Sequence, residues 1–256
     1  MQKAIELVVN GKTLRGMYHR PDRAGKYPTV ILFHGFTGDK LEPHRIFLKL
    51  CRILTEQGLA AIRFDFSGSG ESDGDFVEMT FSTEVYEAEQ ILNYVQDLPT
   101  TDQERIGVVG LSMGGAVASI LAGKNPALVK ALVLWSAAGI DTIAGIYRSK
   151  ENQDIFPRNQ REDLDIGGLW LNHDFYEDLS GWDTYDALKD YQRPVLILHG
   201  TEDQTVPPAT AEKYQAALSG RAKLVYVAGA DHTYNRCHWE EKVLTETVAF
   251  LKKELV

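Results

Sequence analysis

Short apolar runs alternate along this 256-residue chain with longer segments in which apolar residues recur at helical spacing. The run Thr29–Phe33 has no polar side chain after its first residue, which is typical of a strand buried on both faces of a sheet. We expect strands over residues 29–33, 59–64, 105–110, 130–135, 194–198 and 223–227, and helices over residues 44–57, 81–97, 113–124, 208–218 and 239–254. Such alternation predicts an α/β fold with a mostly parallel, twisted sheet and helices on both faces.

The dipeptide Asn10-Gly11 lies between two segments of loosely alternating apolar and polar residues, 4–9 and 13–18. Asn-Gly is a strong signal for a two-residue β-hairpin, because both residues tolerate the positive φ that the turn requires. The sequence therefore predicts that an antiparallel pair of strands leads into the sheet.

Composition and charge exclude several classes of partner. The chain has a formal net charge of −9 and no cluster of Lys and Arg, which argues against nucleic acid and anionic membrane surfaces. No apolar run approaches the roughly 18 residues of a membrane-spanning helix, and acidic and turn residues interrupt the first segment before a signal-peptide core could form. We therefore expect a cytoplasmic protein. Cys51 and Cys237 are expected to be free thiols, Cys51 in the core, and neither has a CxxC partner that would suggest a metal site.

The pentapeptide Gly110-Leu-Ser-Met-Gly114 falls where a strand should pass into a helix. A serine at such a turn has a strained backbone, and its hydroxyl is exposed at the edge of the sheet with the start of a helix behind it. Glycines are expected on either side because a side chain there would collide with the crossing strand and helix. Ser112 is therefore the candidate nucleophile.

A serine hydroxyl needs a base within hydrogen-bond reach, and the base needs a carboxylate that orients it. Functional loops of a parallel sheet follow the carboxyl ends of its strands, and two loops in the last quarter of the chain do so. One loop carries Asp203, with the adjacent Glu202 as a rival acid. The other carries His232, with Asp231 as a second rival acid. We predict that His232 is the base for Ser112 and that Asp203 orients it.

The tetrahedral intermediate of acyl transfer needs two hydrogen-bond donors for its oxyanion. We expect one donor to be the backbone N–H of Met113, directly after the serine. The other is expected to be the backbone N–H of Phe36, in the loop that follows the first long apolar strand. Gly35 would let this loop approach closely, and the ring of Phe36 would form a wall of the acyl pocket.

Other residues that could carry chemistry have structural interpretations. His34 and His199 each end a strand before a glycine, and we interpret both as structural. The glycine-rich segment 65–74 does not match G-x-G-x-x-G, because position 73 is Asp, and the chain has no G-K-[ST] motif. We interpret this segment as a structural turn.

Residues 139–186 separate two expected strands by far more than one crossover helix needs. The segment carries eleven acidic and four basic residues, so most of the chain's net charge lies within it. It leaves the sheet at the edge where Ser112 is expected. We therefore predict a single domain, residues 1–256, in which residues 139–186 form an inserted cap over the site. The alternative is a surface excursion with its own small core. The aromatic residues of the segment are Tyr147, Phe156, Trp170, Phe175, Tyr176, Trp182 and Tyr185.

Together these segments resemble the α/β-hydrolase superfamily across essentially the whole chain. The order serine, acid, histidine is the order in that superfamily, and the single-glycine loop after the third strand excludes its HGGG-type lipases. The matching pieces are His34-Gly-Phe36, Asp65-Phe-Ser-Gly-Ser-Gly-Glu-Ser72, Gly110-Leu-Ser-Met-Gly-Gly115, Gly200-Thr-Glu-Asp-Gln-Thr-Val-Pro207 and Gly229-Ala-Asp-His232.

Within the superfamily the chain is similar to the bacterial cinnamoyl (feruloyl) esterases. That resemblance implies that the insertion after the sixth strand forms an aromatic-binding pocket in which a polar residue holds the phenolic hydroxyl. Carried over to this chain, the substrate-binding positions are Asp141 and Trp170. The family often has Gln after the nucleophile, where this chain has Met113. Only the backbone N–H is needed there, so the departure bears on the subfamily and not on catalysis.

We therefore expect a serine carboxylic-ester hydrolase that acts through an acyl-enzyme on hydroxycinnamate or other small aryl or short-acyl esters. Its partner would be a small-molecule ester, and no metal or cofactor would be required. Alternatives within the fold are a general carboxylesterase, a lipase, a thioesterase and a small peptidase. The absence of a large N-terminal domain weighs against an oligopeptidase, and the short polar cap weighs against a long-chain lipase. A hydrolase-fold ligand receptor without turnover is the alternative from another class. The sequence decides neither the acyl preference nor whether the chain forms a homodimer.

Overall fold

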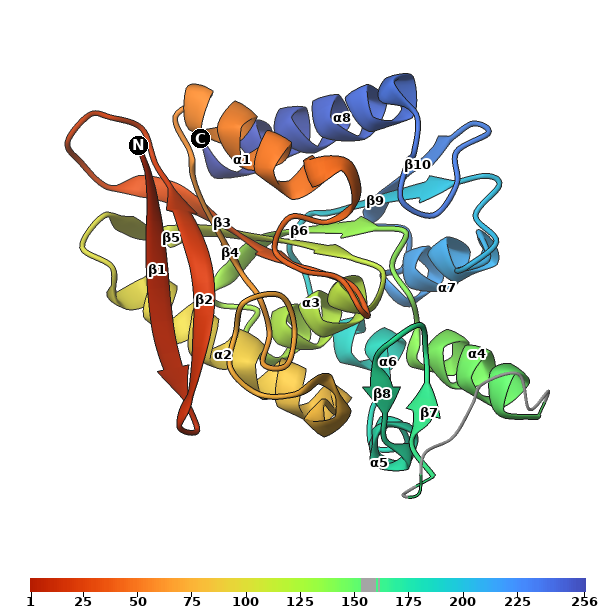
Figure 1. The fold of residues 1–256 in the computed structure, drawn as a ribbon. Coiled ribbons are helices and arrows are strands. Elements are labelled where there is room, and N and C mark those ends of the chain that lie inside the picture. The colour runs from red at the N-terminus through yellow and green to blue at the C-terminus, as the bar shows by residue number, and fades with distance from the viewer. Residues whose placement is uncertain (153–159, 161) are drawn as a thin grey trace.

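A sheet of eight strands runs through the described part of the protein, which in this computed structural model comprises residues 1–152, 160 and 162–256. The strands are β1 (Gln2–Val9), β2 (Lys12–His19), β3 (Tyr27–Phe33), β4 (Ala60–Phe64), β5 (Thr101–Leu111), β6 (Val129–Trp135), β9 (Val195–Gly200) and β10 (Ala222–Val227). Their spatial order is β1-β2-β4-β3-β5-β6-β9-β10 (Figure 1). β2 pairs antiparallel with β1 and with β4, whereas the remaining pairs are parallel.

Helices cover both faces of this sheet (Figure 1). One face is packed against α1 (Ile46–Glu56) and α8 (Cys237–Leu255), and the other against α2 (Phe81–Asp97), α3 (Met113–Lys124) and α7 (Ala209–Ala217). Each face has its own cluster of buried apolar side chains, and every residue of β3 is buried, as its apolar run predicts. The predicted α/β fold with a mostly parallel sheet is confirmed.

The turn between β1 and β2 is the predicted hairpin. Asn10 and Gly11 have φ values of 50° and 79°, and Val9 pairs with Lys12 across the turn. Positive φ at both central residues is what a two-residue hairpin turn of type I′ requires. The antiparallel pair therefore leads into the sheet where the sequence places it.

Several element boundaries differ from the sequence-based expectation, including the starts of two helices and one strand. The helix expected from residue 44 begins at Ile46, because His44 and Arg45 have left-handed φ values of 45° and 63°. β5 begins at Thr101 and not at residue 105. Its first four residues are polar, so the apolar run that predicts the strand starts only after them. α8 begins two residues earlier than expected, at Cys237.

The described residues of the segment 139–186, for which we predict a cap, lie together at one end of the molecule (Figure 1). They include α4 (Ile140–Asn152), β7 (Leu164–Asp165), β8 (Trp170–Leu171), α5 (His173–Leu179) and α6 (Thr184–Leu188). β7 and β8 pair with each other as a separate antiparallel sheet, and α5 is held to α2 by the Ser82 N–H, which donates to Asp178 at 2.7 Å. Residues 153–159 and 161 of the predicted cap, including Phe156, lie outside the described residues.

Two smaller expectations concern thiols and membrane spans. Cys51 is buried in α1 and Cys237 is exposed, and both are free, as predicted. Within the residues that the structure describes, no helix combines the length and the apolar character needed to cross a bilayer.

Gly123 allows α3 to pack closely against α6, since a Cβ there would lie 2.1 Å from the carbonyl oxygen of Ala187. We expect Gly123→Ala to lower the free energy of unfolding by about 1–3 kcal/mol, because the two helices must move apart. Gly145→Ala in α4 is the matched control, because a Cβ there would meet nothing within 4 Å. It should leave stability unchanged or raise it by about 0.5–1 kcal/mol. Urea unfolding measures both, and equal effects would contradict the close packing.

Candidate active site

Ser112 occupies a strained turn between the end of β5 and the start of α3. Its φ of 54° and ψ of −121° lie in a region that costs a non-glycine residue about 1–3 kcal/mol. A Cβ on Gly110 would lie 2.2 Å from the carbonyl oxygen of Gly114, and one on Gly114 would lie 2.2 Å from that of Phe33. The turn can therefore form only with glycine at both positions, as the pentapeptide predicts.

Asp203 and His232 meet at the carboxyl ends of neighbouring strands, β9 and β10. His232 Nδ1 donates to Asp203 Oδ2 at 2.8 Å. The backbone N–H groups of Thr205 and Val206 donate to Asp203 Oδ1 at 2.9 and 2.8 Å. Burial alone would raise the pKa of Asp203, but hydrogen bonds from His199 and His232 outweigh it and hold this pKa well below its usual value. Since an ionised carboxylate only accepts, Nδ1 of His232 carries a proton, and in the neutral form of the ring Nε2 is then the acceptor.

The two rival acids lie elsewhere. Glu202 is exposed, and Asp231 accepts from the backbone N–H of Asn235 at 2.9 Å and from its side-chain amide at 3.1 Å. Among these three neighbouring carboxylates, Asp203 is the one that hydrogen bonds His232.

His199 contacts the same carboxylate, which the sequence analysis does not predict. Its Nε2 lies 2.9 Å from the carbonyl oxygen of Val206 and 3.3 Å from Asp203 Oδ2. Both neighbours accept, so Nε2 carries a proton and Asp203 is restrained by two imidazoles. The signal in the sequence is the four-residue spacing between His199 and Asp203 across a strand end. His34, in contrast, is structural as interpreted, since its Nε2 accepts from the Phe66 N–H at 3.0 Å.

Phe36 and Met113 line the same cavity as Ser112. Neither of their backbone N–H groups donates to any other described residue. A Cβ on Gly35 would lie 3.1 Å from Cβ of Ser112, so the loop after β3 packs directly against the serine. Two unpaired donors beside a serine are the arrangement that an oxyanion requires.

The cavity beside Ser112 and His232 has a volume of about 580 Å³ and a mostly apolar wall. The ring of Phe36 packs against those of Phe76 and Phe175, with centroids 5.4 and 5.5 Å apart. The polar lining of the cavity includes Thr37, Glu42, Thr205 and Thr233. Among its described lining residues there is no Lys or Arg. The predicted cap contributes Ile143, Ile146, Tyr147, Leu164, Ile166, Gly167, Leu171 and Phe175 to this wall.

The two substrate-binding positions carried over from the resemblance do not reach this cavity. Neither Asp141 nor Trp170 occurs among its described lining residues. Asp141 lies in the first turn of α4, where Lys213 Nζ binds it at 2.6 Å and the Tyr185 hydroxyl donates to it at 3.0 Å. Trp170 is 39% exposed on β8. The substrate-binding role of both residues stays a prediction, since Asp141 is paired with Lys213 of α7 and Trp170 is partly exposed.

Glu42 lies in the cavity wall, and the sequence analysis assigns it no role. Its side chain is buried, and Oε1 accepts from the Gly35 N–H at 2.5 Å. Burial raises the pKa of Glu42 to about 7, the Gly35 N–H opposes the shift, and the charge of Asp39 adds to it. No pattern in the sequence marks this residue, since the helical periodicity begins only after it.

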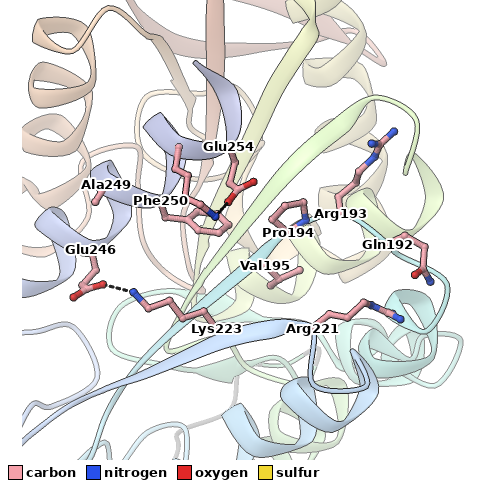
Figure 2. A pocket seen from close by; sticks show the side chains of 11 residues that line it. Gln192, Arg193, Pro194, Val195, Arg221, Lys223, Glu246, Ala249, Phe250 and Glu254 are labelled. Atoms are coloured by element: carbon pink, nitrogen blue, oxygen red, sulfur yellow. Dashed lines mark hydrogen bonds and ion pairs between the residues drawn. The ribbon is translucent and has the colours of Figure 1, made fainter.

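A second hollow of about 610 Å³ lies at the opposite, amino ends of β9 and β10, against α8 (Figure 2). Four of its charged residues form ion pairs, Lys223 with Glu246 and Lys253 with Glu254, whereas Arg193 and Arg221 donate to backbone carbonyl groups. No serine, cysteine or histidine occurs among its described lining residues. The cavity at Ser112 is therefore the candidate active site. Within the described part of the chain, no group of three or more His, Cys, Asp or Glu side chains is placed to hold a metal ion.

Comparison with known proteins places the chain among hydrolases. The sequence model of the prolyl oligopeptidase family matches residues 47–256. An uncharacterized 31.7 kDa protein from the traX-finO intergenic region of Escherichia coli is 25% identical over 91% of this chain and 93% of its own length. The human mitochondrial palmitoyl-protein thioesterase ABHD10 is 28% identical over 86% of this chain and 74% of its own length. The structure of Est1E from Butyrivibrio proteoclasticus with ferulic acid bound is 26% identical, with a TM-score of 0.86 over 98% of this chain and 99% of that one.

Glu42→Gln removes the titratable carboxyl at this buried position but keeps a side-chain oxygen that can accept the Gly35 N–H. A folded-state pKa near 7 lies above the usual 4.5, so the wild-type protein loses stability as pH rises from about 4.5 to about 7. The neutral variant keeps that stability, and the shift corresponds to about 3 kcal/mol. We expect the melting temperature of Glu42→Gln to exceed that of the wild type at pH 8 and to match it near pH 4.5. Thermal melts at both pH values measure the difference, and a constant offset would contradict it.

Proposed function

This chain belongs to the prolyl oligopeptidase family of hydrolases and has the α/β-hydrolase fold, and on that basis we propose that it is a serine carboxylic-ester hydrolase. One observation carries the proposal. Ser112 on its strained turn, His232 paired with Asp203, and the unpaired N–H groups of Phe36 and Met113 all adjoin one apolar cavity. These are the parts that acyl transfer through a serine requires.

In the proposed reaction, Ser112 Oγ attacks the ester carbonyl carbon while His232 Nε2 takes the hydroxyl proton. The N–H groups of Phe36 and Met113 donate to the oxyanion of the tetrahedral intermediate. Its collapse breaks the bond to the alcohol, which leaves with the proton from His232, and the acyl group remains on Ser112. Water then attacks the acyl-enzyme, with His232 again as the base, and the acid is released. Asp203 holds the ring and stabilises the imidazolium, which its lowered pKa allows it to do throughout.

The proposed substrates are small aryl or short-acyl esters, with hydroxycinnamate esters as the leading class. The wall of the cavity is mostly apolar, which suits an aromatic or aliphatic acyl group. Tyr147, whose hydroxyl contacts His173 Nδ1 at 3.1 Å, is a polar group in that wall that could meet a substrate hydroxyl. The similarity to Est1E, whose structure holds ferulic acid, supports the same class.

Thioester hydrolysis is a second candidate for the same site. The similarity to the thioesterase ABHD10 favours it, and a thioester would form the same acyl-enzyme on Ser112 with a thiol as the leaving group. The apolar cavity suits its acyl chain equally well.

Replacing the nucleophile tests the proposed chemistry. We expect Ser112→Ala to lower kcat for a p-nitrophenyl ester by at least about a thousandfold, because no acyl-enzyme can form. A fluorophosphonate probe should label the wild type at Ser112 and leave this variant unlabelled, as mass spectrometry would show. Ser180→Ala, at an exposed serine after α5, is the control and should behave as the wild type. Full activity in Ser112→Ala would overturn the assignment.

A substrate panel tests the proposed class. We compare kcat/KM for methyl hydroxycinnamates, p-nitrophenyl esters of increasing acyl length, acyl thioesters and a prolyl-peptide anilide. Hydroxycinnamates and short aryl esters should give the highest values, because their rings fill the apolar cavity. A higher value for the thioesters would make thioester hydrolysis the function. A higher value for the anilide would replace both proposals by peptidase activity.

A further inference from the structure

Residues Glu42–Arg45, which we call the strap, join the loop after β3 to α1. Glu42, His44 and Arg45 have φ values of 59°, 45° and 63°, in the left-handed region that L-residues other than glycine rarely adopt. With its ψ of 164°, Glu42 occupies a region that is essentially reserved for glycine. Such a backbone persists only where surrounding contacts hold it, and strain of this kind concentrates at functional sites. The contacts of the strap therefore indicate its role.

At one end, the strap holds the loop that carries the Phe36 N–H. The carboxyl of Glu42 accepts from the N–H of Gly35, the residue directly before Phe36, at 2.5 Å. The same carboxyl oxygen packs against Gly38, where a Cβ would lie 2.9 Å from it. The Gly38 N–H in turn donates to the Gly35 carbonyl at 3.0 Å. Glu42 thus fixes the whole turn from Gly35 to Gly38 from one buried position.

At its other end, the strap holds the loop that carries His232. His44 Nε2 lies 2.8 Å from the carbonyl oxygen of Thr233, the residue directly after His232. His44 Nδ1 bonds Glu240 at the start of α8. Lys49 Nζ also donates to the two carboxylate oxygens of Glu240, at 2.8 and 2.9 Å. The carboxylate that binds His44 is therefore itself held in place.

We propose that the strap sets the distance between the oxyanion-binding N–H of Phe36 and the catalytic base His232, and that Glu42 and His44 are its two positioning residues. The inference rests on the proposed function, because it assigns a role in that reaction. Glu42 and Pro43 form part of the cavity wall together with His232 and Thr233, so the strap spans the space between the two catalytic loops. Neither positioning residue acts on the reacting atoms. Each holds a backbone group beside a residue that does.

The expected effect follows from how steeply acyl transfer depends on geometry. A misplacement of about 1 Å at a reacting group can cost a hundredfold in rate, and loss of one oxyanion donor costs about 10²–10³ in kcat. A shift of the turn at Gly35 would weaken binding of the oxyanion, which exists only during reaction, and would leave ground-state binding in the apolar cavity unchanged. The strap should therefore affect kcat and not KM.

The first experiment compares Glu42→Ala with Glu42→Gln. Glu42→Ala removes the acceptor for the Gly35 N–H, and kcat should fall about 10- to 100-fold with KM within about threefold of the wild type. Glu42→Gln retains a carbonyl oxygen that can accept the same N–H, and kcat should recover to within about threefold. Equal losses in both variants would overturn the positioning role of this hydrogen bond. Lys223→Ala, which breaks an ion pair with Glu246 on the far edge of the sheet, is the control for unspecific destabilisation.

The second experiment tests the other end of the strap. His44→Ala should lower kcat about tenfold with KM unchanged, because the Thr233 carbonyl and the Glu240 carboxylate lose their common partner. In the double variant with Glu42→Ala, kcat should fall by less than the product of the two single effects. Once either end is released, the other end no longer sets the spacing. A fully multiplicative effect would overturn the idea of one connected strap.

Circular dichroism and melting temperature accompany each variant, so that an unfolded protein is not taken for an inactive one. If Glu42→Ala does not fold, His44→Ala and Glu42→Gln carry the test, and an unchanged kcat in His44→Ala overturns the proposal. The proposed function is tested separately, and it is wrong if the wild type neither hydrolyses esters nor is labelled at Ser112. An active wild type with an unchanged kcat in Glu42→Ala and His44→Ala rejects the strap alone.

Discussion

The close approach of the β3 loop to the turn at Ser112 is the constraint on which the rest of the candidate site depends. The backbone of Gly114 passes so near β3 that a Cβ would lie 2.2 Å from the carbonyl oxygen of Phe33. Gly35 packs directly against Ser112, where a Cβ on the glycine would lie 3.1 Å from Cβ of the serine. These contacts leave two backbone N–H groups beside the serine, and they exist only because both positions lack a side chain. The strain at Ser112 is the cost of that arrangement, and the burial of β3, β5 and α3 sustains it.

Buried carboxyl groups hold the loops that this approach brings together. Asp65 accepts from the backbone N–H groups of Lys40 and Glu71 at 2.6 and 2.9 Å, and Lys40 Nζ binds its second oxygen at 2.5 Å. A Cβ on Gly70 would collide with the same carboxyl, so the glycine-rich segment wraps around Asp65 and is the structural turn that the sequence predicts. Asp203 plays the same part for the loop after β9. Each carboxylate satisfies several backbone donors, which is how an irregular loop can be buried without unpaired polar groups.

Some properties of the predicted cap follow from the sequence, and others do not. Its length and its place after β6 predict a segment beside the edge that carries Ser112, and its apolar residues do form much of the cavity wall. Which side chains face that wall depends on how α4 and α5 are rotated. Asp141 is paired with Lys213 of α7, and Trp170 on β8 is 39% exposed. The resemblance to feruloyl esterases identifies positions in the chain, whereas the direction of each side chain depends on local packing.

Most strands and helices could be predicted, because apolar runs and helical spacing record burial directly. The candidate residues Ser112, Asp203 and His232 could also be predicted, since each follows a strand end at which a glycine permits a sharp turn. The roles of Glu42 and His44 could not, and the contact of His199 with Asp203 leaves only a four-residue spacing in the sequence. Glu42 and His199 meet their partners where a short stretch of chain folds back on itself, and His44 meets Glu240, which is 196 residues further along the chain. The sequence by itself determined the sheet, its helices and the loops that carry the reacting groups, because these depend on local periodicity and on glycine. Only the tertiary structure decided how those loops are spaced and which side chains hold them, because that depends on hydrogen bonds between segments that meet only after folding.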